Sequence, residues 1–241
     1  MDYTDKVVLI TSGYNGIGKE LVIGFVKNYA KVIVTYHNHY EETLDLVNEI
    51  KEEYDSLIDI YYLDLCKEEC IIDLYNYVND KYGKLDILIN NASLSMDSYY
   101  LDKTKDEFMK VLETNVVGTF LMIKYFNNLM NNGYIFNISS TDGIDTGNVY
   151  SIDYNVSKAG INMLTKTIAI DNPNKIYSIC PNWVDTESTR SMDKDYLDSE
   201  LKRVGQNKLI KPQKIFEVIN KTIKDNIKSG SIIRIEGEDN E

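Results

Sequence analysis

The sequence predicts an α/β fold: a single domain on a doubly wound, mainly parallel sheet with helices on both faces. Short β-branched runs alternate with longer stretches whose apolar residues recur every three or four positions, which is typical of βαβ units. The short runs are almost continuously apolar, as strands buried on both faces require. The 241 residues suit one such domain, 1–241, and no linker, internal repeat or low-complexity tract indicates a second.

Each element can be placed in order along the chain. The seven expected strands are 6–11, 31–36, 57–63, 85–90, 133–139, 175–180 and 231–235. The helical patterns between them include 18–29, 41–54, 68–82, 104–130 and 153–170. A polar, charged segment, 185–209, separates the sixth strand from the last helix, and we expect it to form a mobile substrate lid.

Composition excludes several classes of function. A formal charge of -12 and a pI near 4.7 argue against binding to nucleic acid or to anionic membranes, which favour basic surfaces. No apolar run approaches the roughly 20 residues of a membrane span, and the first residues lack the layout of a signal peptide, so we expect a cytoplasmic protein. Cys66, Cys70 and Cys180 have no metal-binding spacing; we expect free thiols and no metal site.

A glycine-rich turn follows the first expected strand. Gly13, Gly16 and Gly18 precede an apolar helical pattern, so the backbone can approach a pyrophosphate whose charge the helix N-terminus stabilises. The strict GxGxxG spacing is absent, which argues against a standard two-domain dehydrogenase. The turn therefore indicates a dinucleotide site of another type.

The end of the second strand bears on the choice of dinucleotide. Tyr36, His37 and Asn38 include no carboxylate to bind a ribose 2'-hydroxyl, which favours NADP(H) over NAD(H). The same stretch has no arginine, and Asn15 rather than a basic residue stands in the glycine turn, so NAD(H) stays open. His37 and His39 are equally compatible with surface residues without a role.

Several motifs together resemble the classical short-chain dehydrogenase/reductase family over almost the whole chain. The matching segments are TSGYNGIG, LDL at 63–65, NNAS at 90–93, Asn115 in ETNVVGTF, the serine pair of FNISS, YNVSK and PNWVDT. The resemblance is closest to the bacterial 3-oxoacyl-(acyl-carrier-protein) reductase branch. It implies a Rossmann-type sheet with strand order 3-2-1-4-5-6-7. The cofactor site that it implies consists of Thr11, Ser12, Gly13, Asn15, Gly16, Ile17, Gly18, Tyr36, His37, Asn38, Asp64, Leu65, Asn91, Ala92, Ser93, Tyr154, Lys158, Pro181, Asn182, Val184 and Thr186.

Tyr154 and Lys158 are four residues apart and would share one face of a helix. Ketone reduction needs a proton donor near the carbonyl oxygen, and a neighbouring ammonium should lower the tyrosine pKa from its usual value near 10. The resemblance makes Tyr154 the general acid in reduction and the base in oxidation, with Lys158 also holding the nicotinamide ribose. It also implies that Ser140 polarises the carbonyl and that Asn115 orders a proton-relay water.

Two neighbours rival these assignments. Ser139 adjoins Ser140, and only one of them can point toward the substrate from a strand. We choose Ser140 because the family's catalytic serine is usually the second of such a pair. Tyr150 has no basic residue four positions after it, so Tyr154 is preferred.

Three positions depart from the family pattern. Ser12, Ser93 and Asn182 replace glycines beside the expected cofactor, and they adopt unusual backbone angles less easily than glycine does. The replacements motivate an alternative reading as a nucleotide-binding sensor or scaffold without turnover. Family analogy further implies a homotetramer or homodimer built through 104–130 and 153–170.

The preferred interpretation is an NAD(P)(H)-dependent oxidoreductase that reduces a small or medium carbonyl substrate by hydride transfer. The alternative is 3-oxoacyl-(acyl-carrier-protein) reduction, but carrier protein is acidic and the expected docking segments NNLMNNG and IAIDNPN contain no arginine. Arg190, Lys202 and Arg203 in the expected lid could meet an anionic substrate or form a solvated face.

Overall fold

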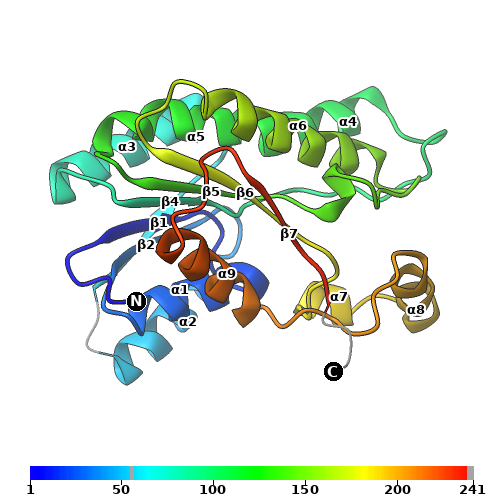
Figure 1. The fold of residues 1–241 in the computed structure, drawn as a ribbon, viewed down its shortest axis with the longest axis horizontal. Coiled ribbons are helices and arrows are strands. Elements are labelled where there is room, and N and C mark those ends of the chain that lie inside the picture. The colour runs from blue at the N-terminus through cyan, green and yellow to red at the C-terminus, as the bar shows by residue number, and fades with distance from the viewer. Residues whose placement is uncertain (55–56, 238–241) are drawn as a thin grey trace.

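A computed structural model describes residues 1–54 and 57–237. Parallel strands form one seven-stranded sheet in the order β3-β2-β1-β4-β5-β6-β7, which confirms the predicted fold and strand order (Figure 1). Residues 238–241, which the sequence assigned to the domain, lie outside the described residues. The strands are β1 Val7–Ile10, β2 Lys31–Tyr36, β3 Ile58–Tyr62, β4 Ile87–Asn90, β5 Tyr134–Ile138, β6 Lys175–Pro181 and β7 Ile232–Ile235.

Helices cover both faces of this sheet. Figure 1 shows α3, α4, α5 and α6 above it and α1, α2 and α9 below it, with α7 and α8 beyond the ends of β6 and β7. Among the described residues, no helix is long and apolar enough to cross a membrane. The helices are α1 Gly16–Val26, α2 Tyr40–Glu53, α3 Glu68–Tyr82, α4 Lys105–Leu112, α5 Thr119–Phe126, α6 Ile152–Ile168, α7 Glu187–Arg190, α8 Lys194–Arg203 and α9 Gln213–Lys224.

The apolar strands supply a core on each face. Val8 and Ile10 of β1 pack with Phe25 of α1 on one face, while Val7 and Leu9 belong to the cluster on the other. These side chains are almost fully buried because successive residues of a strand point to opposite faces. All seven strands run in one direction, so their carboxyl ends meet along one edge, where open α/β sheets bind ligands.

The stretch 104–130 is not one continuous α-helix as predicted. A π-helical turn, Glu113–Gly118, separates α4 from α5, and a 3-10 turn, Asn127–Leu129, follows. Asn115 lies in the π-helical turn with its side chain fully buried. Single π-helical turns inside helices are frequent at functional sites, and this one lies against the loop that follows β4.

Candidate active site

The glycine turn after β1 borders a cavity of about 300 Å³. Gly16 has a φ of +50°, in the left-handed region that favours glycine. A Cβ on Gly18 would lie 2.2 Å from the Ser12 carbonyl oxygen and 2.8 Å from Asn91 Nδ2, so only glycine fits there. The predicted cofactor residues that line the cavity are Ser12, Asn15, Gly16, Ile17, Gly18, Asn91, Ser93, Tyr154, Lys158 and Thr186.

Other predicted cofactor residues support this turn. The Thr11 hydroxyl accepts hydrogen bonds from the backbone amides of Asn91 and Ala92, both at 2.9 Å. The Asn91 side chain donates to the carbonyl oxygens of Thr11, at 3.1 Å, and of Ser12, at 2.7 Å. Gly13 packs against Val34 of β2. These bonds join the glycine turn to the end of β4.

Of the three glycine replacements, one has an unusual backbone angle. Ser12 has a φ of +57°, whereas neither Ser93 nor Asn182 is among the described residues with positive φ. The Asn182 amide donates to the Ile235 carbonyl oxygen at 2.9 Å, as an extended residue beside β7 can. Among the three replacements, the backbone strain of a positive φ is therefore confined to Ser12.

The residues expected on the adenosine side lie outside the cavity lining. The carboxylate of Asp64 is 3.7 Å from His37 Nε2 and 3.2 Å from Lys67 Nζ. Although partial burial opposes the effect, the Cys66 amide and Lys67 hold the pKa of Asp64 below its usual value. Leu65 is buried and Asn38 is exposed, while Tyr36 packs edge-on against Tyr62 at the end of β2.

Tyr154 and Lys158 both lie on α6 and reach one cavity. Lys158 Nζ is 5.1 Å from the centre of the Tyr154 ring and donates to the Ile138 carbonyl oxygen at 2.8 Å. The Ser140 hydroxyl lies near Tyr154 and acts to lower the tyrosine pKa. The structure thus brings together the predicted serine, tyrosine and lysine.

The pKa of Tyr154 moves in the direction opposite to our expectation. Burial raises it, and the nearby Asp142 carboxylate raises it further, against a smaller opposing effect of the Ser140 hydrogen bond. Burial also lowers the pKa of Lys158 to about 8. The prediction of a lowered tyrosine pKa is therefore wrong for the protein without cofactor, because desolvation is the largest effect on the pKa of both groups.

The two rival residues differ in their contacts, although Ser139 also lines both cavities at Tyr154. The Ser139 hydroxyl donates to the Lys158 carbonyl oxygen at 3.1 Å, so it helps to dock α6 on β5. The Ser140 hydroxyl accepts the Asp142 amide and faces Tyr154. Tyr150 is exposed and packs near Tyr99. This geometry favours Ser140 and Tyr154 as the predicted pair.

The Asn115 side chain is fully occupied by structural bonds. Its Nδ2 donates to the Leu94 carbonyl oxygen at 2.8 Å and to the Ser157 hydroxyl at 3.0 Å. Its Oδ1 accepts the Leu94 amide at 2.7 Å. Asn115 therefore ties the loop after β4 to α6.

A second cavity, of about 520 Å³, adjoins Tyr154 and Ser140 and is bordered by the 185–209 segment. The predicted residues Pro181, Asn182 and Val184 line it together with Thr186. Sequence reasoning missed the polar residues on its walls, namely Asp97, Asp142, Asn148, Ser151 and Tyr196. All of these except Tyr196 lie in the loops after β4 and β5. Their position after the carboxyl ends of strands could have identified them from the sequence.

The basic residues of the 185–209 segment do not line this cavity. Arg190 is exposed and lies 3.2 Å from Asp185, and Lys202 is exposed. Arg203 is paired with Glu200 at 2.7 Å. The solvated interpretation of these charges therefore fits better than contact with an anionic substrate.

Comparisons with known proteins identify the family. The family model described as short chain dehydrogenase matches residues 6–197. A 3-oxoacyl-(acyl-carrier-protein) reductase, FabG, from Thermotoga maritima is 29% identical over 240 residues, which cover 96% of each chain. Glucose 1-dehydrogenase 2 from Bacillus subtilis is also 29% identical, over 226 residues that cover 89% of this chain and 86% of that protein.

Solved structures share the fold. The crystal structure of a short chain dehydrogenase from Burkholderia cenocepacia in complex with NADP superposes with a TM-score of 0.91 at 20% identity and covers 98% of both chains. The match of the family model covers more than half of the sequence. The chain belongs to the short-chain dehydrogenase family, whose members are oxidoreductases that act on CH–OH and C=O groups with NAD(P).

Proposed function

We propose that this protein interconverts a small or medium carbonyl compound and its alcohol, with Tyr154 as the proton-transferring residue. The observation that carries the proposal is that Tyr154 lines both the glycine-turn cavity and the larger cleft. Ser140 lines the same cleft, and Lys158 Nζ lies 5.1 Å from the centre of the Tyr154 ring.

The residues of the glycine-turn cavity fit a nicotinamide dinucleotide. The support is the cradle in which a Cβ on Gly18 has no room, together with the buried ammonium of Lys158. The turn at Gly16 and Ile17 would hold the pyrophosphate, and Lys158 the nicotinamide ribose. When bound, the cofactor supplies or accepts a hydride at the carbonyl carbon.

The side chains then handle the oxygen of the substrate. In reduction the Tyr154 O–H bond breaks and its proton forms the new alcohol O–H bond, while Ser140 donates a hydrogen bond to the developing oxyanion. In oxidation the tyrosinate takes that proton back. A protonated Lys158 stabilises the tyrosinate in either direction.

For the cofactor, we propose a preference for NADP(H) over NAD(H). The support is the absence of a carboxylate at Tyr36, His37 and Asn38, together with the NADP-bound Burkholderia structure of the same fold. Parallel titrations with NADPH and NADH, followed by nicotinamide fluorescence, test this. Tighter binding of NADH would overturn the preference.

The proposed activity is tested by steady-state oxidation of NADPH in the presence of a ketone panel, with wild type and Tyr154→Phe side by side. We expect turnover by the wild type and a loss of about 10²- to 10⁴-fold in the variant, the usual contribution of a general acid. Equal rates would refute the role of Tyr154. Wild-type binding of cofactor without turnover on any ketone or alcohol would favour the sensor or scaffold alternative.

A second candidate is reduction of a 3-oxoacyl group on acyl carrier protein. Its support is the similarity to the Thermotoga reductase along nearly the whole chain. The two aspartates that line the cleft and the expected docking segments without arginine argue against it. A 3-oxoacyl thioester in the ketone panel decides between the two.

We also propose that residues 185–209 act as a lid and that the protein forms a homotetramer or homodimer. Exposed apolar side chains, Phe120 of α5 and Val156 and Met163 of α6, support assembly through the two predicted helices. Light scattering that gives a stable monomer would refute the assembly.

A further inference from the structure

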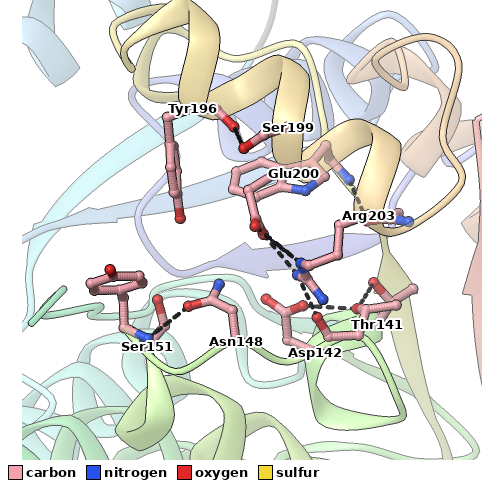
Figure 2. Close-up of polar contacts among 12 residues, drawn as sticks. Thr141, Asp142, Asn148, Ser151, Tyr196, Ser199, Glu200 and Arg203 are labelled. Carbon is pink, nitrogen blue, oxygen red and sulfur yellow. Dashed lines mark hydrogen bonds and ion pairs between the residues drawn. The ribbon is translucent and has the colours of Figure 1, made fainter. Parts of the chain in front are cut away.

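The wall of the cleft opposite the glycine turn is polar and carries no cation. Among the described residues that line the cleft there is no lysine, arginine or histidine, but there are two aspartates, Asp97 and Asp142. Figure 2 shows this end of the cleft, with Asp142 and Asn148 on the loop after β5 and Tyr196 on α8 reaching toward that loop.

The arginine at the end of α8, Arg203, is already bonded to protein groups. Arg203 donates through Nε and Nη2 to Glu200, at 2.7 to 3.1 Å, and through Nη2 to the Thr146 carbonyl oxygen at 2.7 Å (Figure 2). Thr146 in turn donates to Asp142 Oδ1 at 2.8 Å. This network joins α8 to the loop after β5 and leaves no cation facing the cleft for an anionic substrate.

The amide of Asn148 has a defined orientation. Its Oδ1 accepts the backbone amides of Tyr150, at 2.9 Å, and Ser151, at 3.2 Å, so its Nδ2 group is the end left to donate. Asp97 Oδ1 accepts the hydroxyls of Ser95, at 2.9 Å, and Ser151, at 2.7 Å. The cleft therefore presents an amide donor beside two carboxylates, and within the described chain their known hydrogen bonds all go to Oδ1.

Tyr196 of α8, in the proposed lid, adds a hydroxyl group to the hydrogen-bonding side chains that line the cleft. Burial and the neighbouring Glu200 carboxylate raise its pKa, so the hydroxyl stays protonated at neutral pH and can both donate and accept. Its ring is an apolar platform next to Met192 in the same wall. An unbranched hydrocarbon chain placed here would displace water from the amide, the hydroxyl and the carboxylates without replacing its hydrogen bonds, which is unfavourable.

We propose that the substrate is a neutral, polyhydroxylated carbonyl compound or the corresponding polyol, held by Asn148, Tyr196, Asp97 and Asp142. This inference rests on the proposed function. Hydroxyl groups next to the reacting carbon both donate to the carboxylates and accept from the amide, as this wall requires. An anionic substrate meets two carboxylates and no free cation.

The test compares four-carbon ketones that differ in the hydroxyl groups or the charge that would face this wall. 2-Butanone has no hydroxyl, erythrulose has three, and acetoacetate is an anion. With NADPH and wild-type protein we expect kcat/KM for erythrulose to exceed that for 2-butanone at least tenfold, and acetoacetate to be the poorest. A preference for 2-butanone or acetoacetate would overturn the proposal.

Two conservative variants locate the effect. Tyr196→Phe keeps the ring, and Asn148→Asp keeps the acceptor that holds the Tyr150 and Ser151 amides, so neither should unfold the loop. Each is expected to raise KM for erythrulose at least tenfold while kcat/KM for 2-butanone changes less than threefold. Tyr29→Phe, at an exposed position on the far side of α1, is the matched control. An unchanged erythrulose KM in both variants would overturn the assignment of these side chains.

A binding readout separates this inference from the proposed function. Trp183 is the single tryptophan of the chain and lines the cleft, so its fluorescence reports occupancy. Saturable quenching by erythritol that 2-butanol and 3-hydroxybutyrate do not reproduce would support the polyol site even if no ketone were reduced. If 2-butanol or 3-hydroxybutyrate bound as well as erythritol, or if erythritol did not bind, the proposal would fail.

Discussion

A buried ion pair beside Tyr154 yields the sharpest prediction on stability. Lys103 Nζ lies 3.0 Å from Asp153 Oδ2, and the two side chains are only 3% and 0% exposed. Asp153 Oδ1 accepts the Tyr154 amide, and Lys103 also donates to the Met96 carbonyl oxygen. The pair therefore connects the loop after β4 to the residue that we assign to proton transfer.

The magnitude follows from this burial. Replacing Lys103 by Met leaves the Asp153 carboxylate without its counter-ion, and breaking a buried pair in this way costs about 3–5 kcal/mol. For a chain of this size each kcal/mol lowers Tm by about 2–4 °C, so we expect a fall of about 6–20 °C. The double variant Lys103→Met/Asp153→Asn removes both charges and keeps an acceptor for the Tyr154 amide, so it should recover at least half of the loss.

Urea and thermal unfolding of the wild type, Lys103→Met, Asp153→Asn and the double variant measure this directly. Lys105→Met is the matched control, because Lys105 is exposed at the start of α4. If Lys103→Met costs no more stability than Lys105→Met, or if the effects of Asp153→Asn and Lys103→Met simply add, the buried pair does not contribute as proposed. A coupling of at least 2 kcal/mol in the double-mutant cycle is expected of groups in contact.

Three further predictions follow from the site. Burial lowers the pKa of Lys158 to about 8, below its unfolded value of 10.5. The buried ammonium therefore destabilises the folded state below pH 8, and this destabilisation disappears as the pH rises to 10.5. In urea titrations Lys158→Met should be more stable than wild type at pH 7, by up to about 3 kcal/mol, and should lose much of that advantage by pH 9.5. Ser12→Gly should be more stable than Ser12→Ala by about 1 kcal/mol because only glycine relieves the positive φ, and equal Tm values would contradict this. Gly18→Ala should weaken NADPH binding at least tenfold in fluorescence titrations, while Gly160→Ala, where a Cβ meets only ordinary contacts, should not.

The fold was predictable because it depends on patterns that are local in the sequence. Continuous apolar strands alternate with amphipathic stretches, and the strand order follows from the family motifs. The π-helical turn in 104–130 has no signature in the sequence pattern, and the partners of Asn115 within it, Leu94 and Ser157, lie far away in the sequence.

The site was predictable only where residue spacing fixes geometry. Tyr154 and Lys158 share a helix face, so four residues suffice to place them. The direction of the tyrosine pKa was missed because it is set by burial and by Asp142, neither of which has a signature in sequence. The polar wall was not predicted for a similar reason. Asn148 and Tyr196 line the same cleft only because α8 lies over the loop after β5.

The central claim is that Tyr154 transfers the proton in a nicotinamide-dependent carbonyl reduction. Its most direct test is a single-turnover experiment in which wild type and Tyr154→Phe are preloaded with NADPH, mixed with excess ketone and followed at the nicotinamide absorbance. The account predicts equal NADPH affinity in the two proteins and a rate of hydride transfer at least 100-fold lower in the variant. Equal hydride-transfer rates at equal NADPH occupancy would contradict it.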